Sequence, residues 1–446
     1  MSNIRVTHSA SPDNARAESA VIVNPNNPQQ VVAASKMFNG LHDYQFVLAT
    51  AYSIDGGHNW NESQALKLPL DASGITDPAL AWDDSNNVFL LGLALKNLPK
   101  GDDVGITVYK STDGGQTWGD PYVIHSGASD DKCWLVGDTN LNSPHHGNLY
   151  AVWDSAGGLG YARSLDHGDS WESIAGGTID GTTIWPNSHD PEINIAADGN
   201  VYVVFRVVEF VLLVSDNGGD SFTLMPDAPT NTVVEIDPFN GTPSAGGGWA
   251  VLPGGNFRVI TAPSACVVDQ TVVIAWADWR DGKARIYYAL SHDGGASWIT
   301  DPAGQPLLTG SIPDNFHHVF PQVIADPSGV IACSYYEFGP KPQDNLIDVF
   351  VARSLDGGLT FLPFKVTDQP WDPTINAPWA HWRNDFSKID ASCTFIGDYF
   401  GLDASYRASI RAGQTLVTGR RSCIPTSSPC LAALSSLNAA RWARTR

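Results

Sequence analysis

The stretch Ser111–Trp118, STDGGQTW, decides the fold, because variants of it recur along the chain. Its pattern is S-x-D-x-G-x-(S/T/N)-(W/F), and each copy is called a box below. Successive boxes begin 58, 53, 51, 76 and 63 residues apart. The other copies are Ser53–Trp60 (SIDGGHNW), Ser164–Trp171 (SLDHGDSW), Ser215–Phe222 (SDNGGDSF), Ser291–Trp298 (SHDGGASW) and Ser354–Phe361 (SLDGGLTF). Six copies predict one repeat architecture rather than several unrelated domains.

Each box is predicted to form a hairpin turn. It follows a stretch of alternating apolar residues such as Phe46–Ser53, FVLATAYS. Ser and Asp side chains hydrogen-bond turn backbone, and glycine adopts positive φ without steric cost. A catalytic or calcium-binding role for the box Asp residues is the less favoured alternative, because a site needs unlike groups to converge.

The segments between boxes predict four short strands each. From Asp77 onward the runs are DPALAWDD, NVFLLGLALK and GITVYKS before the box and PYVIHSG after it, separated by turn residues. A repeating four-stranded antiparallel unit of this length predicts an all-β propeller, with one domain over residues 1–404. We expect seven blades, the last closed by a strand near residues 4–8; six blades is the alternative. Pro226–Gly255 is predicted to be a long loop.

Composition excludes several classes of protein. The 446 residues carry 26 Lys+Arg and 47 Asp+Glu, a net charge of −21, which disfavours nucleic acid as a partner. The 43% hydrophobic content excludes a disordered chain, and no apolar run predicts a membrane span. The N-terminus MSNIRVTHSASPDN lacks the apolar core of a secretory signal, which leaves the compartment open. Six scattered cysteines without a CxxC pair predict neither a zinc framework nor a disulfide scaffold.

The C-terminal tail differs from the rest of the chain. Residues 405–446 contain seven Arg and no Lys, Asp or Glu, and no box follows. One back-translation of Gly413–Gly419 (GQTLVTG), shifted by one base, encodes a motif close to Trp276–Asp281 (WADWRD). We therefore weigh two hypotheses, a tail read out of frame and a disordered Arg-rich tail.

The boxes make the chain resemble the Asp-box, or BNR-repeat, propellers, whose best-known members are the sialidases. Ala17–Ser35, Asp131–Asp138 and Phe395–Leu402 look like bacterial proteins described as exo-α-sialidase-like. The resemblance covers the chain to about residue 404. It implies a glycoside hydrolase that acts on a carbohydrate or glycoconjugate over the central channel. We expect a monomer with no cofactor and no metal ion.

The resemblance also implies how a sialidase site would be built. Sialidases clamp the substrate carboxylate with three arginines, one in an Arg-Ile-Pro-like motif, because a guanidinium binds a carboxylate through two hydrogen bonds. This chain has no Arg-Ile-Pro. Sialidases use a tyrosine nucleophile paired with a glutamate. Adjacent residues of these types occur at Tyr336–Glu337 and Asp398–Tyr399.

Ligands of such propellers bind on the face opposite the boxes, so polar residues at equivalent positions of different blades are the candidates. The catalytic candidates are Glu337, Tyr336, Asp398, Tyr399, Asp190 and Glu192. The substrate-binding candidates are Arg258, Arg206, Arg280, Asp131, Lys132, Trp134, His317, Trp379 and Trp382. The last two lie in Trp371–Phe386, a predicted loop that equally suits a plug for the last blade. Glu18 and Asp77 occupy equivalent positions, where an Asp more often holds backbone N–H groups than does chemistry.

Three functions remain open. A sialidase-like hydrolase predicts three arginines and a Tyr–Glu pair at one channel mouth. A non-catalytic glycan- or protein-binding propeller predicts aromatic pockets without a close pair of acids. A structural or assembly scaffold predicts a flat mouth and a large apolar side patch.

Overall fold

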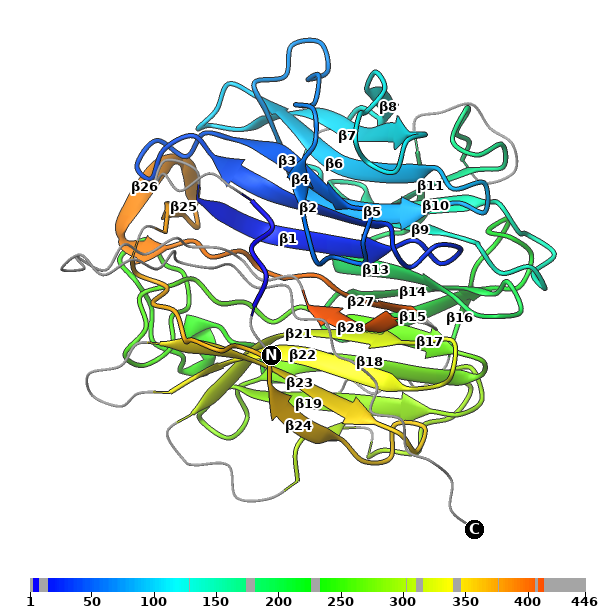
Figure 1. Cartoon of the computed structure of the whole chain (residues 1–446). Coiled ribbons are helices and arrows are strands. Elements are labelled where there is room, and N and C mark those ends of the chain that lie inside the picture. The colour runs from blue at the N-terminus through cyan, green and yellow to red at the C-terminus, as the bar shows by residue number, and fades with distance from the viewer. Residues whose placement is uncertain are drawn as a thin grey trace.

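The computed structural model of the chain is all-β and describes most of its residues (Figure 1). The described residues are 3–7, 15–127, 129–173, 181–225, 233–301, 303–309, 316–339, 346–375, 377–405 and 408–412. Within these ranges no α-helix occurs, and the helical element is a single 3-10 turn, η3 (Pro238–Asn240). None of these residues therefore forms a helix long and apolar enough to cross a membrane.

Six antiparallel sheets of four strands form the blades of a propeller. The first strands are β1 (Arg16–Val23), β5 (Gly74–Trp82), β9 (Asp131–Gly137), β13 (His189–Ile195), β17 (Ser264–Val268) and β21 (His317–Ala325). The second strands are β2 (Val31–Phe38), β6 (Val88–Lys96), β10 (Leu149–Ser155), β14 (Val201–Arg206), β18 (Thr271–Asp278) and β22 (Ile331–Phe338). The third strands are β3 (Phe46–Ser53), β7 (Asp102–Ser111), β11 (Gly158–Ser164), β15 (Phe210–Ser215), β19 (Arg285–Ser291) and β23 (Ile347–Ser354). The fourth strands are β4 (Asn61–Glu62), β8 (Tyr122–His125), β12 (Thr182–Trp185), β16 (Thr223–Leu224), β20 (Gln305–Pro306) and β24 (Leu362–Lys365).

The ring closes through a short hairpin near the C-terminus. β27 (Leu402–Ser405) pairs with β28 (Ala408–Ala412), and β27 contacts both β1 and β21. Figure 1 shows this hairpin at the centre, between the blue first blade and the yellow sixth blade. The propeller thus has six four-stranded blades, which was the alternative to the seven expected from sequence. The two-stranded hairpin β27–β28 lies where the seventh blade was expected. Residues 3–7 form no strand, so the closing strand predicted near residues 4–8 is not found there. The tail beyond residue 412 lies outside the described residues.

The boxes join the third strand of each blade to the fourth. In the fifth box, the Ser291 hydroxyl donates to Asp293 Oδ1 (2.8 Å) and accepts from the backbone N–H of Gly295 (2.9 Å). Asp293 Oδ1 accepts from the backbone N–H of Ser297 (2.8 Å). The serine bonds recur in the other five boxes. The box side chains thus hold the turn that follows each third strand.

Removing a box serine is expected to destabilise its blade. Ser291 is buried, and in Ser291→Ala the N–H of Gly295 loses its acceptor away from water. An unsatisfied buried donor costs roughly 1–3 kcal/mol. We expect urea unfolding to give a free energy of unfolding about 1–2 kcal/mol below wild type. A change smaller than about 0.5 kcal/mol would contradict this role for the box serine.

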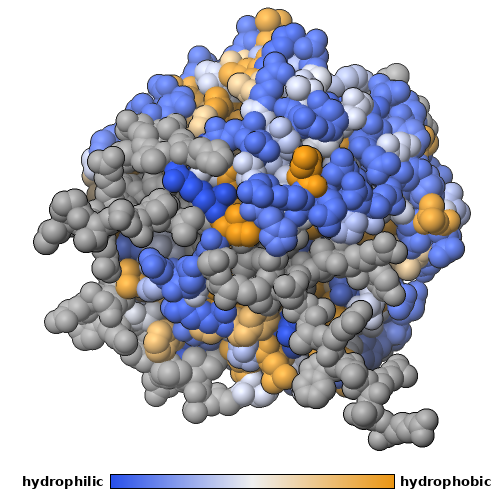
Figure 2. Space-filling view, viewed as in Figure 1, coloured by the Kyte–Doolittle hydropathy of each residue, from blue (hydrophilic) through white to orange (hydrophobic). Residues whose placement is uncertain are grey.

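Apolar side chains fill the space between neighbouring blades. Val32 and Leu48 of the first blade pack in one cluster with Ile75 and Leu90 of the second. The surface visible in Figure 2 is mainly hydrophilic, with hydrophobic residues scattered over it. The core therefore lies between the sheets, which fixes the blades rigidly around the channel.

A second hairpin and the long insertion form a wall on one face of the propeller. β25 (Trp379–Trp382) pairs with β26 (Asp385–Thr394), where sequence analysis predicted a loop. The backbone N–H of Arg258 donates to the Thr394 carbonyl (3.0 Å), and Trp249 Nε1 donates to the His381 carbonyl (2.5 Å). The insertion is thus docked on the hairpin by bonds between residues more than 130 positions apart.

Candidate functional site

A cavity of about 740 Å³ opens beside the wall, at the mouth of the channel. It lies on the face opposite the boxes, because its walls come from the starts of the first and third strands and the ends of the second strands. The lining residues are Glu18, Lys36, Tyr44, Phe46, Thr76, Asp77, Leu93, Leu95, Lys96, Leu98, Pro99, Lys100, Gly101, Asp102, Asp103, Gly127, Ser129, Asp130, Asp131, Trp249, Arg258, His381, Phe395 and Asp398. Its volume is typical of sites that bind small molecules.

Bulges occur near the starts of four of the first strands, and two of them turn an acidic side chain into the cavity. The register of the first and second strands shifts at Glu18, Asp77, Asp190 and Phe320 in four blades. These residues have φ between +49° and +54°. A bulge inserts a residue and redirects its side chain, and such strain is concentrated at functional sites. Glu18 and Asp77 line the cavity as a result.

Arg258 and Asp398 form an ion pair on the wall of the cavity. Arg258 Nε donates to Asp398 Oδ1 (2.9 Å), and Nη2 donates to Oδ2. The guanidinium stacks on Trp249, with Cζ 3.8 Å from the ring centroid. Burial lowers the pKa of Arg258, but Asp398 and the other acids outweigh it and raise the pKa. The wall therefore presents a fixed cation beside an aromatic plane, which suits the hydroxyl groups and ring of a sugar.

Lys36 and Glu18 form a second ion pair, deeper in the cavity. Lys36 Nζ lies 3.5 Å from Glu18 Oε2, and both side chains are buried. Thr76 Oγ1 donates to the same oxygen (3.2 Å). Burial raises the pKa of Glu18, whereas the charge of Lys36 acts to lower it. The pair thus fixes charges of opposite sign next to Asp77.

Asp77 and Asp131 are two carboxyl groups with different surroundings. Asp77 is buried, and Tyr399 donates its hydroxyl to Asp77 Oδ1 (3.2 Å). Burial and the charges of Glu18 and Asp131 raise the pKa of Asp77 well above its usual value. Asp131 is exposed to the cavity, and Oδ1 accepts the backbone N–H of Lys132 (2.9 Å). Although its side chain reaches the cavity surface, the surrounding protein shields Asp131 from bulk water and raises its pKa, and the N–H of Lys132 and the charge of Arg258 oppose this rise.

Three residues predicted from sequence line the cavity: Asp131, Arg258 and Asp398. Tyr399 does not line the cavity itself, but its hydroxyl donates to Asp77, which does. Asp398 and Tyr399 therefore act on different partners although they are adjacent in sequence.

Several predicted residues pair locally and lie away from the cavity. Arg206 Nη1 lies 2.5 Å from Glu235 Oε1, and Arg206 Nη2 lies 3.6 Å from Asp190 Oδ2. Arg280 Nη2 lies 2.7 Å from Asp278 Oδ2. The three candidate arginines thus do not converge at the cavity: Arg258 lines it and the other two do not.

The predicted Tyr336–Glu337 pair does not converge at the cavity either. Tyr336 is buried and stacks on Phe400, with ring centroids 4.4 Å apart. Glu337 Oε2 lies 3.0 Å from His318 Nε2. Neighbouring residues of a strand point to opposite faces, which separates the two side chains.

The remaining candidates line a smaller cavity or pack elsewhere. Glu192 and Trp134 line a cavity of about 160 Å³ inside the channel, where Glu192 Oε2 accepts the backbone N–H of Ala265 (2.7 Å). Lys132 lies 5.3 Å from the centroid of the Trp134 ring. The others make ring contacts: His317 stacks on Trp279, Trp379 packs against His42, and Lys388 lies over the ring of Trp382.

Sequence reasoning missed Lys36, Tyr44, Trp249 and His381. Lys36 gave a signal, a single cation within the apolar run VVAASKMF. Trp249 gave a weaker one, an aromatic residue in a glycine-rich insertion.

Asp154 is expected to make stability depend on pH. Burial, and secondly the charge of Asp190, raise the pKa of Asp154 to about 7, although Ser188 Oγ donates to Oδ1 (2.5 Å). An acid with a raised pKa in the folded state contributes most stability below its ordinary pKa of 3.8 and loses it as the pH rises to about 7. We expect Asp154→Asn to remove roughly 2–4 kcal/mol of the decline in unfolding free energy between pH 4 and pH 8, measured by urea unfolding. Parallel pH profiles of the two proteins would contradict this expectation.

No family model matches the chain, and no curated protein matches it. Among solved structures, it is similar to the intramolecular trans-sialidase from Ruminococcus gnavus in complex with oseltamivir carboxylate (14% identity, TM-score 0.49, 80% of this chain and 98% of that chain). It is also similar to a protein of unknown function from Dyadobacter fermentans (14%, TM-score 0.47, 79% and 98%). A third is the Hadza microbial sialidase Hz136 (15%, TM-score 0.48, 75% and 65%). At these values the likeness carries no argument about what this chain binds.

Proposed function

We propose that the protein hydrolyses glycosidic bonds in the 740 Å³ cavity, with Asp77 as the proton donor and Asp131 as the second carboxylate. The observation that carries the proposal is the pair itself. One buried acid has a strongly raised pKa, and an acid exposed to the same cavity lies near enough to contribute to that shift. Two carboxyl groups in unlike environments are the usual machinery of glycoside hydrolysis.

Asp77 has the features of a general acid. Its raised pKa favours the neutral carboxyl group, which holds a proton for the leaving oxygen. Because Oδ1 accepts the Tyr399 hydroxyl, Oδ2 is the oxygen left to carry that proton. Burial raises the pKa of Tyr399 well above 10, so this residue remains a donor and orients the carboxyl group.

Asp131 is assigned the second role. As a carboxylate it either activates a water molecule or attacks the anomeric carbon, and the proton from Asp77 goes to the departing sugar oxygen in both cases. Arg258 and Trp249 line the same cavity, where a hydrogen-bond donor and an aromatic ring suit a sugar.

The charge of the cavity favours a neutral or basic sugar. Its acidic residues are Glu18, Asp77, Asp102, Asp103, Asp130, Asp131 and Asp398, and its cations are Lys36, Lys96, Lys100 and Arg258. Since Arg206 and Arg280 pair elsewhere, Arg258 would meet a substrate carboxylate without their help. We therefore expect neutral glycosides to be better substrates than an α-sialoside.

A binding propeller and a scaffold are supported less well. Aromatic pockets without a close pair of acids would favour binding alone, and here the charge of Asp131 helps to raise the pKa of Asp77. A scaffold would favour a flat mouth, and the mouth holds a cavity of about 740 Å³.

Fluorophore release from a panel of aryl glycosides tests the proposal. We expect the wild-type chain to cleave at least one neutral glycoside, and Asp131→Asn to lower kcat/KM at least about 100-fold. The matched control is Asp198→Asn, because Asp198 is exposed in a turn on the box face. No release from any glycoside by a folded sample would overturn the proposal. Cleavage of the α-sialoside alone, lost in Arg258→Ala, would replace the neutral sugar with an acidic one.

A further inference from the structure

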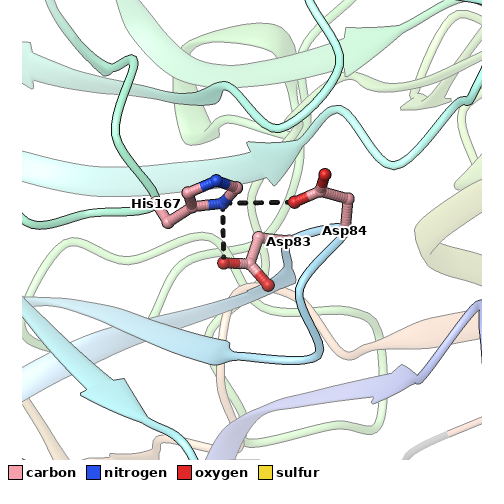
Figure 3. A group of neighbouring side chains, drawn as sticks. All are labelled: Asp83, Asp84 and His167. Carbon is pink, nitrogen blue, oxygen red and sulfur yellow. Dashed lines mark ion pairs between the residues drawn. The ribbon is translucent and has the colours of Figure 1, made fainter.

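A group of metal-ligating side chains lies on the box face, away from the cavity. Asp83 and Asp84 are in the turn between β5 and β6, and His167 is in the third box (Figure 3). β5 and β7, the first and third strands of the second blade, run in the same direction because each pairs antiparallel with β6. The turn after a first strand therefore lies at the same end of a blade as the box, which follows the third strand. The second and third blades thus meet at these three residues.

The three side chains point at one another. His167 Nδ1 lies 3.3 Å from Asp83 Oδ2 and 3.1 Å from Asp84 Oδ1. The three ligand atoms all lie within 4.8 Å of one another, a spacing compatible with metal bonds of about 2.0–2.2 Å. Figure 3 shows the imidazole nitrogen facing both carboxylates. This nitrogen is shielded from solvent, and the groups that it faces are the two carboxylates, so the three ligand atoms enclose one small space that a cation could occupy.

Surrounding groups hold both carboxylates in place. Asp83 is fully buried; Oδ1 accepts the backbone N–H groups of Ser85 (2.9 Å) and Asn87 (2.7 Å). The second oxygen of Asp84 lies 3.2 Å from His146 Nδ1. Partners of this kind orient metal ligands before the ion arrives.

His167 occupies a position that is glycine in the other boxes. The five glycines adopt φ between +66° and +76° at this position; they are Gly56, Gly114, Gly218, Gly294 and Gly357. His167 adopts φ +59° there, a conformation that is unfavourable for a side chain other than glycine. The third box therefore bears a conformational cost, and the side chain that it gains faces two carboxylates.

We propose that Asp83, Asp84 and His167 bind one divalent transition-metal ion, with Zn²⁺ the preferred probe. One imidazole nitrogen and two carboxylate oxygens are a ligand set that Zn²⁺ accepts, and two carboxylates balance its charge. Three protein ligands leave room for water. The ion joins the second blade to the third, so it stabilises the fold rather than the chemistry of the cavity. Sequence analysis expected no metal ion, because the boxes were interpreted as turns only.

His167→Gly tests the site without threatening the fold, because it restores the residue of the other five boxes. The full chain is treated with a chelator and titrated with ZnCl₂ by calorimetry. We expect one Zn²⁺ per wild-type chain and a rise in Tm on binding. In His167→Gly we expect affinity at least about 100-fold lower and no rise in Tm.

The matched control is His58→Ala, because His58 is an exposed histidine in the first box. It should bind Zn²⁺ like wild type. Failure of wild type to bind stoichiometric Zn²⁺ would overturn the proposal, as would equal affinity in His167→Gly. A loss in His58→Ala as large as in His167→Gly would point to surface histidines in general and would also overturn it.

Discussion

Asparagine in place of Asp77 is expected to lower kcat/KM on an active glycoside by about 100- to 10,000-fold, the range that general acid catalysis supplies. Asparagine keeps the shape of the side chain and an oxygen that accepts the Tyr399 hydroxyl, but its amide cannot transfer a proton to the leaving group as a carboxylic acid does. The loss should therefore be in kcat, while binding of the sugar changes little. Steady-state kinetics on the panel substrate with the highest rate measures it.

The pH dependence separates a chemical role of Asp77 from a structural one. The pKa of Asp77 is raised by burial and by neighbouring acids, so activity should fall as the pH rises through it and the proton is lost. For the same reason Asp77 contributes stability below its ordinary pKa and loses it as pH rises. Asp77→Asn should remove the alkaline limb of the rate profile and be at least as stable as wild type at pH 8. An equal kcat in the variant, or a variant that is unfolded at pH 8, contradicts this assignment.

The fold was predictable because each blade repeats its own local signals. The boxes locate the end of every third strand, and strand direction then places the opposite face at the channel mouth. Asp131, Arg258 and Asp398 were found in this way, from positions equivalent by repeat. The blade count was harder, because β27 and β28 carry no box and close the ring by contacts far apart in the chain.

The rest of the site depends on contacts that no local pattern encodes. Trp249 reaches the cavity because its insertion docks on the hairpin β25–β26, a contact between distant segments. Arg280 was predicted at the mouth. Its guanidinium instead donates two hydrogen bonds to Asp278, two residues earlier in the chain. His167 was visible in the sequence as the one departure from glycine among six boxes, but its carboxylate partners come from another blade.

Removing the buried cation Lys36 is expected to cost about 3–5 kcal/mol of folding free energy, because Glu18 is left buried without its partner. Lys36→Met preserves the aliphatic volume and the contact with Phe46, whose ring centroid lies 4.2 Å from Nζ. The charge of Lys36 lowers the pKa of Glu18, so the variant raises that pKa further. The loss should therefore be largest at high pH and shrink as Glu18 is protonated. Urea unfolding at pH 5 and pH 8 measures both effects.

Two further variants decide whether the pair itself is responsible. Glu18→Gln combined with Lys36→Met removes both charges and should recover a large share of the loss, since a buried pair replaced by uncharged groups is often near neutral. Lys67→Met is the matched control, because Lys67 lies 2.9 Å from Asp120 on the exposed surface, where a pair contributes at most about 1 kcal/mol. If the double variant were as unstable as Lys36→Met alone, the lysine would act through its packing against the aromatic rings. If Lys36→Met were as stable as Lys67→Met, the cavity would be wet enough to solvate Glu18, and Asp77 beside it would lose the burial on which its role as proton donor rests.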